Sequence, residues 1–130
     1  MNPGAGGAAA GEPGRRGRAV TLTGEQLQQA ARRTADALPG TTSSRPFSPG
    51  LDVRKVAGKV FLIVTDDPGE RIITVKAEPE HGRRLRAAYP SVGVGRYLDK
   101  THWISVGAGP GVTAALVEEL VTDSYDLVRS

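Results

Sequence analysis

The sequence predicts a single α+β domain in two layers, a mainly antiparallel sheet with helices packed on one face. Two observations carry this prediction. Amphipathic helical segments with recognisable start signals stand near the beginning, middle and end of the chain, and the apolar runs between them are mostly joined by short turns. Strands joined by short turns pair antiparallel, which leaves one face of the sheet for the helices. A length of 130 residues fits one domain with a substantial core, which we place at residues 21–130.

Residues 1–20 are Gly, Ala, Pro and Arg with almost nothing to bury, a composition typical of a disordered tail. Arg15, Arg16 and Arg18 lie close together in this tail. They could contact phosphate as a flexible arm, or they could simply be solvated.

The first predicted helix begins after Thr23, which forms a capping box with Gln26. Leu22 and Leu27 have the spacing of a hydrophobic staple across the same helix start. The apolar stripe that follows is mostly Ala, so the helix should lie close to whatever it covers. The Pro39-Gly40 pair ends it.

A turn-rich segment, 40–51, leads into three predicted strands. Residues 53–56 and 59–64 read as a hairpin around Ala57-Gly58, and residues 71–76 as the third strand. Residues 60–64 are apolar at consecutive positions, which favours a central strand with both faces covered.

The second half of the chain predicts a helix, a strand and a final helix. Pro79 suits the first position of a helix that ends at Tyr89-Pro90, with Leu85, Ala88 and Tyr89 as its buried stripe. Residues 91–95 form a loop or short strand, and alternation around Trp103 predicts a further strand. The last helix begins after Thr113, and Asp123-Ser124 could cap a separate final turn.

Composition and charge exclude several classes of protein. The chain has no Cys, which rules out disulfides and Cys-based metal sites and suits a reducing cytoplasm. No apolar run approaches the roughly 20 residues that a membrane span needs, and the N-terminus lacks the apolar region of a signal peptide. The net charge is +3, of which residues 1–20 supply +2, so the body is nearly neutral. Nucleic-acid binding would therefore need a local basic surface.

The stretch from Gly95 to Val106 holds the only Trp of the chain and is the first candidate for a binding region. Lys100, His102 and Trp103 could form a surface that binds phosphate and stacks on a base. In the other interpretation, Trp103 fills the core and Lys100 pairs with Asp99 or another carboxylate. Trp is usually highly buried, which favours burial of Trp103.

The densest basic set in the body is formed by Arg83, Arg84, Arg86 and Arg96. These side chains could follow the backbone of a DNA duplex, or the first three could be the solvated face of a helix.

Catalytic and metal-binding patterns are missing. His81 and His102 could act as acid–base groups, but no nucleophile or ligand-like spacing accompanies them. The Gly107–Gly111 turn lacks the Lys and Ser/Thr of a phosphate-binding loop. We therefore expect no catalytic residues, no metal and no cofactor.

Several blocks of the chain resemble the MmcQ/YjbR family. They are Val56-Ala-Gly-Lys-Val-Phe61, Val75-Lys76 with Glu78-Pro79-Glu80, Gly95 through Trp103, and Ser124-Tyr125-Asp-Leu-Val128. The resemblance covers about residues 23–130. The chain departs from the family pattern at Val94, where the family usually has Pro, and at Tyr97-Leu98-Asp99, where it usually has His, then Leu or Met, then Asn. Asp99 places an anion beside Lys100.

The resemblance implies a two-layer domain of the frataxin-like (CyaY-like) type, and many members are described as DNA-binding. The expectation is therefore a small protein that contacts the backbone of double-stranded DNA with little sequence specificity. The expected contacts are Arg83, Arg84, Arg86, Arg96, Lys100 and His102. The alternative is a non-catalytic protein-interaction module, which the neutral body and the acidic last helix would also suit. Iron binding of the frataxin kind is not expected, because the first helix lacks an acidic ridge.

Overall fold

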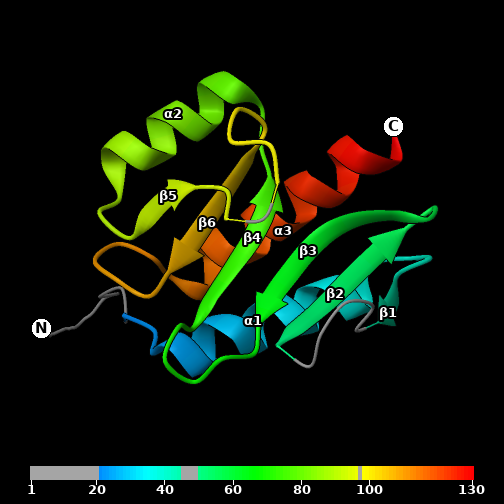
Figure 1. Ribbon diagram of the computed structural model, residues 1–130, viewed down its shortest axis with the longest axis horizontal. Helices are drawn as coiled ribbons and strands as arrows, with labels where there is room; N and C mark the ends of the chain where they lie inside the picture. The colour runs from blue at the N-terminus through cyan, green and yellow to red at the C-terminus, as the bar shows by residue number, and fades with distance from the viewer. Residues whose placement is uncertain (1–20, 45–49, 97) are drawn as a thin grey trace, which may run out of the picture.

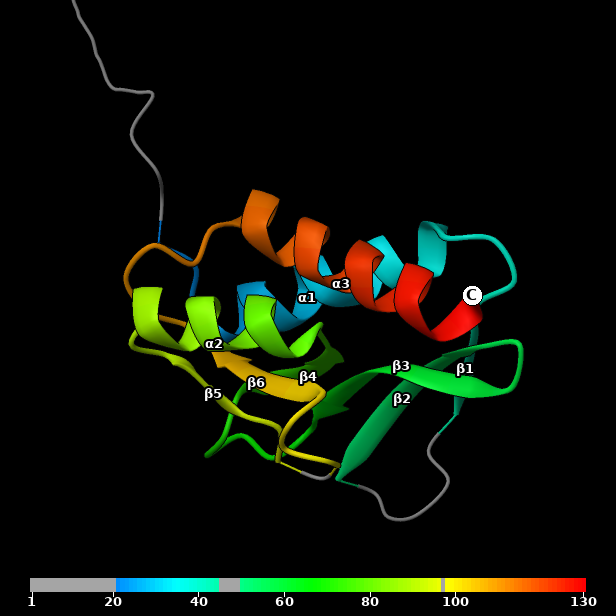
Figure 2. The same ribbon diagram turned by 90° about the horizontal axis from the view of Figure 1, so that it is seen from above.

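The computed structural model describes residues 21–44, 50–96 and 98–130, and these form two layers (Figures 1 and 2). The elements are α1 (Gly24–Ala37), β1 (Thr42–Ser44), β2 (Leu51–Val56), β3 (Lys59–Thr65), β4 (Ile72–Lys76), α2 (Pro79–Ala88), β5 (Val92–Val94), β6 (Trp103–Gly107) and α3 (Ala114–Arg129). Figure 2 shows all the helices above one face of the sheet. The predicted α+β class and its one-sided helix layer are confirmed.

The six strands form one open sheet in the order β1-β2-β3-β4-β6-β5, and every neighbouring pair is antiparallel. The two central strands, β3 and β4, follow one another in the chain and are joined by a turn. The crossing from β4 to β5 carries α2, and β5 then pairs back onto β6 at the edge.

Helix α1 begins as the sequence predicts. The Thr23 hydroxyl accepts a hydrogen bond from the Gln26 N–H at 3.1 Å, and the Gln26 side chain accepts one from the Thr23 N–H at 2.9 Å. These two bonds satisfy backbone donors that have no partner inside the helix. The helix ends at Ala37, just before Pro39.

The β2–β3 hairpin contains a tight turn and a bulge. Ala57 and Gly58 both have positive φ, 53° and 77°, as a two-residue turn of the I′ kind requires. Further along, Arg54 pairs with Leu62 and Lys55 with Val60, so Phe61 has no partner opposite it. The extra residue lets both Phe61 and Leu62 join the core between sheet and helices.

The core lies between the sheet and the helices. Helix α3 contacts α1 and crosses β3 and β4, whereas α2 lies against β5. Phe61 of β3 meets Tyr125 of α3 edge to face, with ring centroids 5.4 Å apart. Of the consecutive apolar residues of β3, Val60 is partly buried and residues 61–64 are buried, and the strand lies inside the sheet between β2 and β4, as expected.

An ionic cluster joins α1 to β2 at the border of this core. Asp52 accepts hydrogen bonds from Arg54 at 2.6 Å and from Arg32 at 2.9 Å, and Arg54 also donates to Asp36 at 2.7 Å. Burial lowers the pKa of Arg54, but its hydrogen bonds to Asp36 and Asp52 outweigh burial and leave that pKa raised. Arg54 and Asp52 are both buried, so removing either one would leave the other as a buried charge without this partner.

Three expectations for individual elements need correction. The turn-rich segment 40–51 contains β1, a strand of Thr and Ser whose exposed side chains give no apolar alternation. Helix α3 runs without a break to Arg129, so Asp123-Ser124 caps no separate turn. Ala88 is exposed and Tyr89 only partly buried, so Gly82 and Leu85 alone form the buried stripe of α2. The proposed tail, 1–20, lies outside the described residues.

Ser124 fastens α3 to two strands. Its hydroxyl is fully buried, donates to the Phe61 carbonyl at 2.7 Å and accepts from the Lys76 N–H at 2.9 Å. The Phe61 carbonyl belongs to the bulge and the Lys76 N–H to the last residue of β4. One side chain therefore satisfies two backbone groups from neighbouring strands.

Replacing Ser124 by Ala should lower the free energy of unfolding by about 2–6 kcal/mol, since two backbone groups lose their partner at roughly 1–3 kcal/mol each. Denaturant unfolding measures the change. Thr122→Ala, on the same helix and partly exposed, is the matched control and should cost clearly less. Equal costs for the two variants would show that the Ser124 bridge contributes little.

Candidate functional site

Helix α2 is held against the sheet at Gly82 and Leu85, the two buried residues of the helix. A Cβ atom on Gly82 would lie 3.3 Å from Ile104 Cγ2 of β6, so the absence of a side chain lets α2 approach closely. This contact decides which face of α2 points outward.

Two of the three arginines of α2, Arg83 and Arg84, lie away from that contact. Arg83 and Arg84 are exposed, and Arg86 is partly exposed. Arg83 donates to Glu80 one turn earlier, at 2.5 Å, but both side chains are mostly in water. Arg86 extends back along the helix, because its Nη1 atom lies 3.4 Å from where a Gly82 Cβ would be. The predicted basic helix surface is present.

Arg96 lies on a loop that crosses the other face of the sheet. The loop from β5 to β6 passes in front of the strands in Figure 1, opposite the helices. The Arg96 N–H donates to Ser105 Oγ at 3.0 Å, and the Arg96 guanidinium forms an ion pair with Glu70. Ser105 in turn shares a 3.0 Å hydrogen bond with the buried Thr74 of β4.

Lys100 and His102 lie in the turn that precedes β6, and Asp99 organises that turn. Asp99 Oδ1 accepts from the Thr101 N–H at 2.8 Å, and Asp99 Oδ2 is 2.5 Å from His102 Nδ1. The hydrogen bond with His102, followed by that from Thr101, lowers the pKa of Asp99. Lys100 is exposed, and the carboxylate beside it in the sequence stays ionised to lower pH than usual.

The six residues expected to bind DNA therefore do not form one patch. Arg83, Arg84 and Arg86 project from the helix layer, and the sheet separates them from the Arg96 loop (Figure 2). Arg96 and His102 each have a carboxylate partner. Arg96 is close to the α2 arginines in the sequence, which suggested a single basic patch. Strand β5 runs between them, and the chain reaches the other face of the sheet before Arg96.

The burial of Trp103 is intermediate between the two interpretations offered by the sequence, a core residue and an exposed stacking surface. It is partly buried and packs against the edge of the core. The Gly95 N–H donates to the Trp103 carbonyl at 2.8 Å, so the loop begins directly against this residue.

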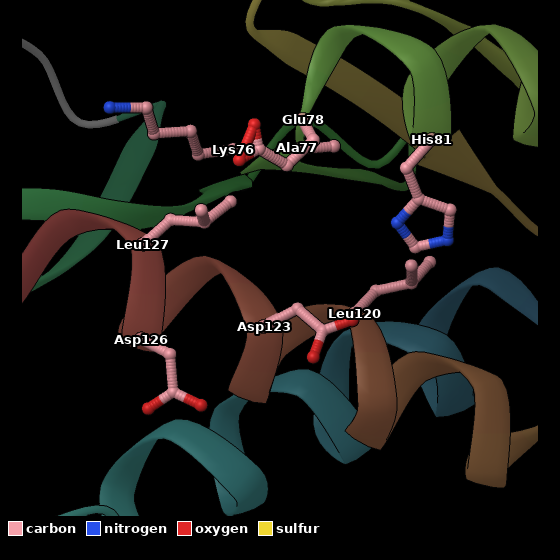
Figure 3. A pocket seen from close by; sticks show the side chains of 8 residues that line it. All are labelled: Lys76, Ala77, Glu78, His81, Leu120, Asp123, Asp126 and Leu127. Carbon is pink, nitrogen blue, oxygen red and sulfur yellow. The ribbon is translucent and has the colours of Figure 1, made fainter. Parts of the chain in front are cut away.

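A pocket that the sequence did not predict opens between α2 and α3, with a volume of about 240 Å³. Figure 3 shows its lining side chains, which come from the end of β4, the residues leading into α2, the start of α2 and the middle and second half of α3. They are Lys76, Ala77, Glu78, His81, Leu120, Asp123, Asp126 and Leu127. More than 30 residues separate the first four from the last four in the chain, so no local motif could reveal the pocket.

A metal cluster and a membrane-spanning helix are both absent from the described residues. Within residues 21–44, 50–96 and 98–130, no three His, Cys, Asp or Glu side chains gather as a metal site would need. In the same part of the chain no helix has both the length and the apolar character to cross a bilayer.

Gly95→Ala should be destabilising by about 1–3 kcal/mol, the usual cost of overpacking. A Cβ at this position would lie 2.5 Å from Trp103 Cβ and 2.9 Å from its carbonyl oxygen, so the loop would have to shift. Thermal melting checks this prediction. Gly93→Ala on the neighbouring strand is the control, because a Cβ there meets nothing within 4 Å. A Gly95→Ala protein that melts like Gly93→Ala would contradict the packing described.

Removing the His102 partner should move the titration of Asp99. The pKa of Asp99 is lowered from 3.8 in the folded protein, so the pair stabilises the turn above about pH 3.8 and loses this effect as the pH falls through the lowered value. In His102→Gln the Asp99 carboxyl should titrate nearer 3.8, as followed by carboxyl-carbon NMR. His81→Gln, far from this turn in sequence, should leave it unchanged. An unchanged midpoint in His102→Gln would rule out the His102 hydrogen bond as the cause.

Comparison with known proteins places the chain in a family. The YjbR family model matches residues 36–127. The chain is 36% identical over 104 residues to "Uncharacterized protein YbdF" of Escherichia coli O157:H7, covering 80% of this chain and 85% of that protein.

Solved structures agree. Deinococcus radiodurans protein DR2400, of domain DUF419, superposes with a TM-score of 0.71 at 30% identity, over 85% of this chain and 80% of that one. A protein from Pseudomonas syringae shares the fold, with a TM-score of 0.63 at 24% identity, over 82% of this chain and 98% of that one. The matched family model spans both candidate regions, the outer surface of α2 and the whole pocket lining, and the chain belongs to the YjbR family.

Proposed function

We propose that this protein binds double-stranded DNA in the cytoplasm through the outer surface of α2, contacting backbone phosphates with little sequence specificity. The observation that carries the proposal is a group of three arginines within four positions of one helix, of which Arg83 and Arg84 are exposed and Arg86 is partly exposed. Guanidinium groups bind phosphate well because their planar fork of donors matches its oxygens.

Two of the three arginines are available without breaking an ion pair. Among the described residues, neither Arg84 nor Arg86 has a carboxylate within salt-bridge distance. Arg83 does have one, Glu80, but an exposed pair of this kind is typically worth less than about 1 kcal/mol. A phosphate could therefore replace Glu80 at small cost.

The acidic start of α2 directs where DNA would lie. Glu78 directly precedes the helix and Glu80 lies in its first turn; both are exposed, and their negative charges repel phosphate from that end. The later part, from Arg83 onward, carries the positive charge. Its other outward residues, Ala87 and Ala88, have no hydrogen-bonding groups, which supports backbone contact over base reading.

The proposed interface is smaller than the sequence suggested. Arg96 and His102 are engaged with Glu70 and Asp99, and Lys100 follows Asp99 directly. We therefore leave these three residues out of the interface and assign it to α2.

A salt titration of duplex binding tests the proposal. With three phosphate contacts the logarithm of the binding constant should fall against the logarithm of salt concentration with a slope of about −3, near 0.9 for each contact. Arg83→Gln, Arg84→Gln and Arg86→Gln together should remove most of that slope without unfolding the protein, because none of the three side chains is buried in the core.

The matched control changes three other exposed or partly exposed cations, Arg33→Gln, Lys59→Gln and Lys100→Gln, and lowers the net charge by the same amount. It should keep the slope within about one contact of the original. Absence of binding by the original protein at about 50 mM salt, where such contacts are strong, would end the DNA proposal. An equal loss of salt slope in the control variant would show that binding depends on net charge and not on the arginines of α2.

A protein partner is the second candidate, and the acidic surface of α3 favours it. Glu118, Glu119 and Asp126 are exposed on this helix, next to the basic α2. Neighbouring surfaces of opposite charge suit a protein partner with complementary charges better than a uniformly negative duplex. Co-purification of one defined protein from nuclease-treated lysate, together with no retention on DNA at moderate salt, would select this candidate.

A further inference from the structure

The pocket between α2 and α3 has an apolar base. Ala77 and Leu120 are buried, and Leu127 is partly buried. Figure 3 shows Leu127 pointing toward Ala77, and the His81 ring projecting from α2 above Leu120. At about 240 Å³ the pocket is smaller than the roughly 300–1,000 Å³ of sites for drug-sized ligands. Its size suits a single extended side chain.

The rim of the pocket is predominantly acidic. Glu78 comes from the start of α2, and Asp123 and Asp126 come from one face of α3, three positions apart. Lys76 is the one fully charged cation of the lining, and its amine points away from the centre of the pocket in Figure 3. A ligand with a positive head would therefore be attracted, and an anionic one repelled.

Asp123 is the pocket carboxylate whose negative charge is balanced least by nearby donors and cations. Among the described residues it has neither a hydrogen-bond donor nor an ion-pair partner, whereas Asp126 already accepts from Arg129 at 3.4 Å. Burial raises the pKa of Asp123, and so does repulsion from Glu119 and Asp126, against an opposing effect of His81. A cation placed beside Asp123 would offset both the cost of burying its negative charge and the repulsion from its acidic neighbours.

We propose that this pocket binds an arginine side chain of a partner polypeptide, with the aliphatic part on Ala77, Leu120 and Leu127 and the guanidinium beside Asp123. Arginine fits better than lysine for two reasons. Its guanidinium is weakly hydrated and stacks on flat rings such as that of His81, and its several donors can reach more than one carboxylate. Its aliphatic stem covers apolar surface while the charged head stays near water.

The inference does not depend on DNA binding. The arginines of the proposed DNA interface lie on the outer surface of α2, and only His81 and Glu78 of the pocket come from the start of that helix. Substitutions in the pocket and on the outer surface can therefore fail separately.

The test uses a terminally blocked Gly-Arg-Gly peptide and the full chain labelled with ¹⁵N. The peptide should shift the amide signals of residues 76–81 and 120–127 in a saturable way at neutral pH. The same peptide with citrulline in place of arginine has nearly the same shape without the charge. It should bind at least about tenfold more weakly, the scale of one charge-assisted hydrogen bond.

The variant Asp123→Asn keeps the size of the side chain and should weaken arginine-peptide binding by a similar factor of about ten. Glu118→Gln, on the exposed side of the same helix and outside the pocket, removes an equal charge and should change affinity less than about twofold. Equal binding of the citrulline peptide, full affinity in Asp123→Asn, or no shifts in residues 76–81 and 120–127 would each overturn the proposal. Asp123→Asn with a normal melting curve ensures that loss of binding is not loss of fold.

Discussion

The bridge formed by the Ser124 hydroxyl fixes the arrangement on which the candidate surfaces depend. It joins the bulge at Phe61 and the end of β4 at Lys76 to the middle of α3. The chain turns into α2 directly after Lys76, so the same bridge sets the distance between the start of α2 and α3. A helix interior offers no backbone donor or acceptor to its neighbours, since its own ladder uses them. A small buried hydroxyl is one of few ways to satisfy two strand groups from that side.

Positive and negative side chains lie mainly on different helices of the helix layer. Helix α2 presents arginines after its first turn, whereas α3 presents carboxylates along its exposed side. The pocket lies where these two surfaces meet, and its base is apolar because Ala77 and Leu120 belong to the core and the partly buried Leu127 lies beside them. On the opposite face of the sheet lies the loop from β5 to β6. The Arg96 N–H donates to Ser105 and its guanidinium pairs with Glu70, and these contacts hold this loop in place. The charge of Arg96 is thus used within the fold, whereas the arginines of α2 and the pocket belong to the helix layer.

The sequence predicted what depends on neighbours in the chain. Thr23 and Gln26 form the capping box that their spacing indicated, Ala57-Gly58 forms the hairpin turn, and Pro79 begins α2. It missed features that depend on distant contacts. The Thr and Ser residues of β1 give no apolar pattern, and Ser124 resembles a cap until its partners 63 and 48 residues away are known. The basic set was split because β5 turns the chain back, and the pocket was missed because its two walls are far apart in sequence.

The central claim is that α2, and not the loop before β6, is the surface that meets DNA. Mapping backbone amide shifts of the ¹⁵N-labelled protein with a short mixed-sequence duplex at low salt tests it directly. The account predicts that the largest shifts fall on residues 83–88 of α2, that residues 95–102 change little, and that duplexes of different sequence give the same pattern. Shifts centred on residues 95–102, with α2 unaffected, would contradict the account.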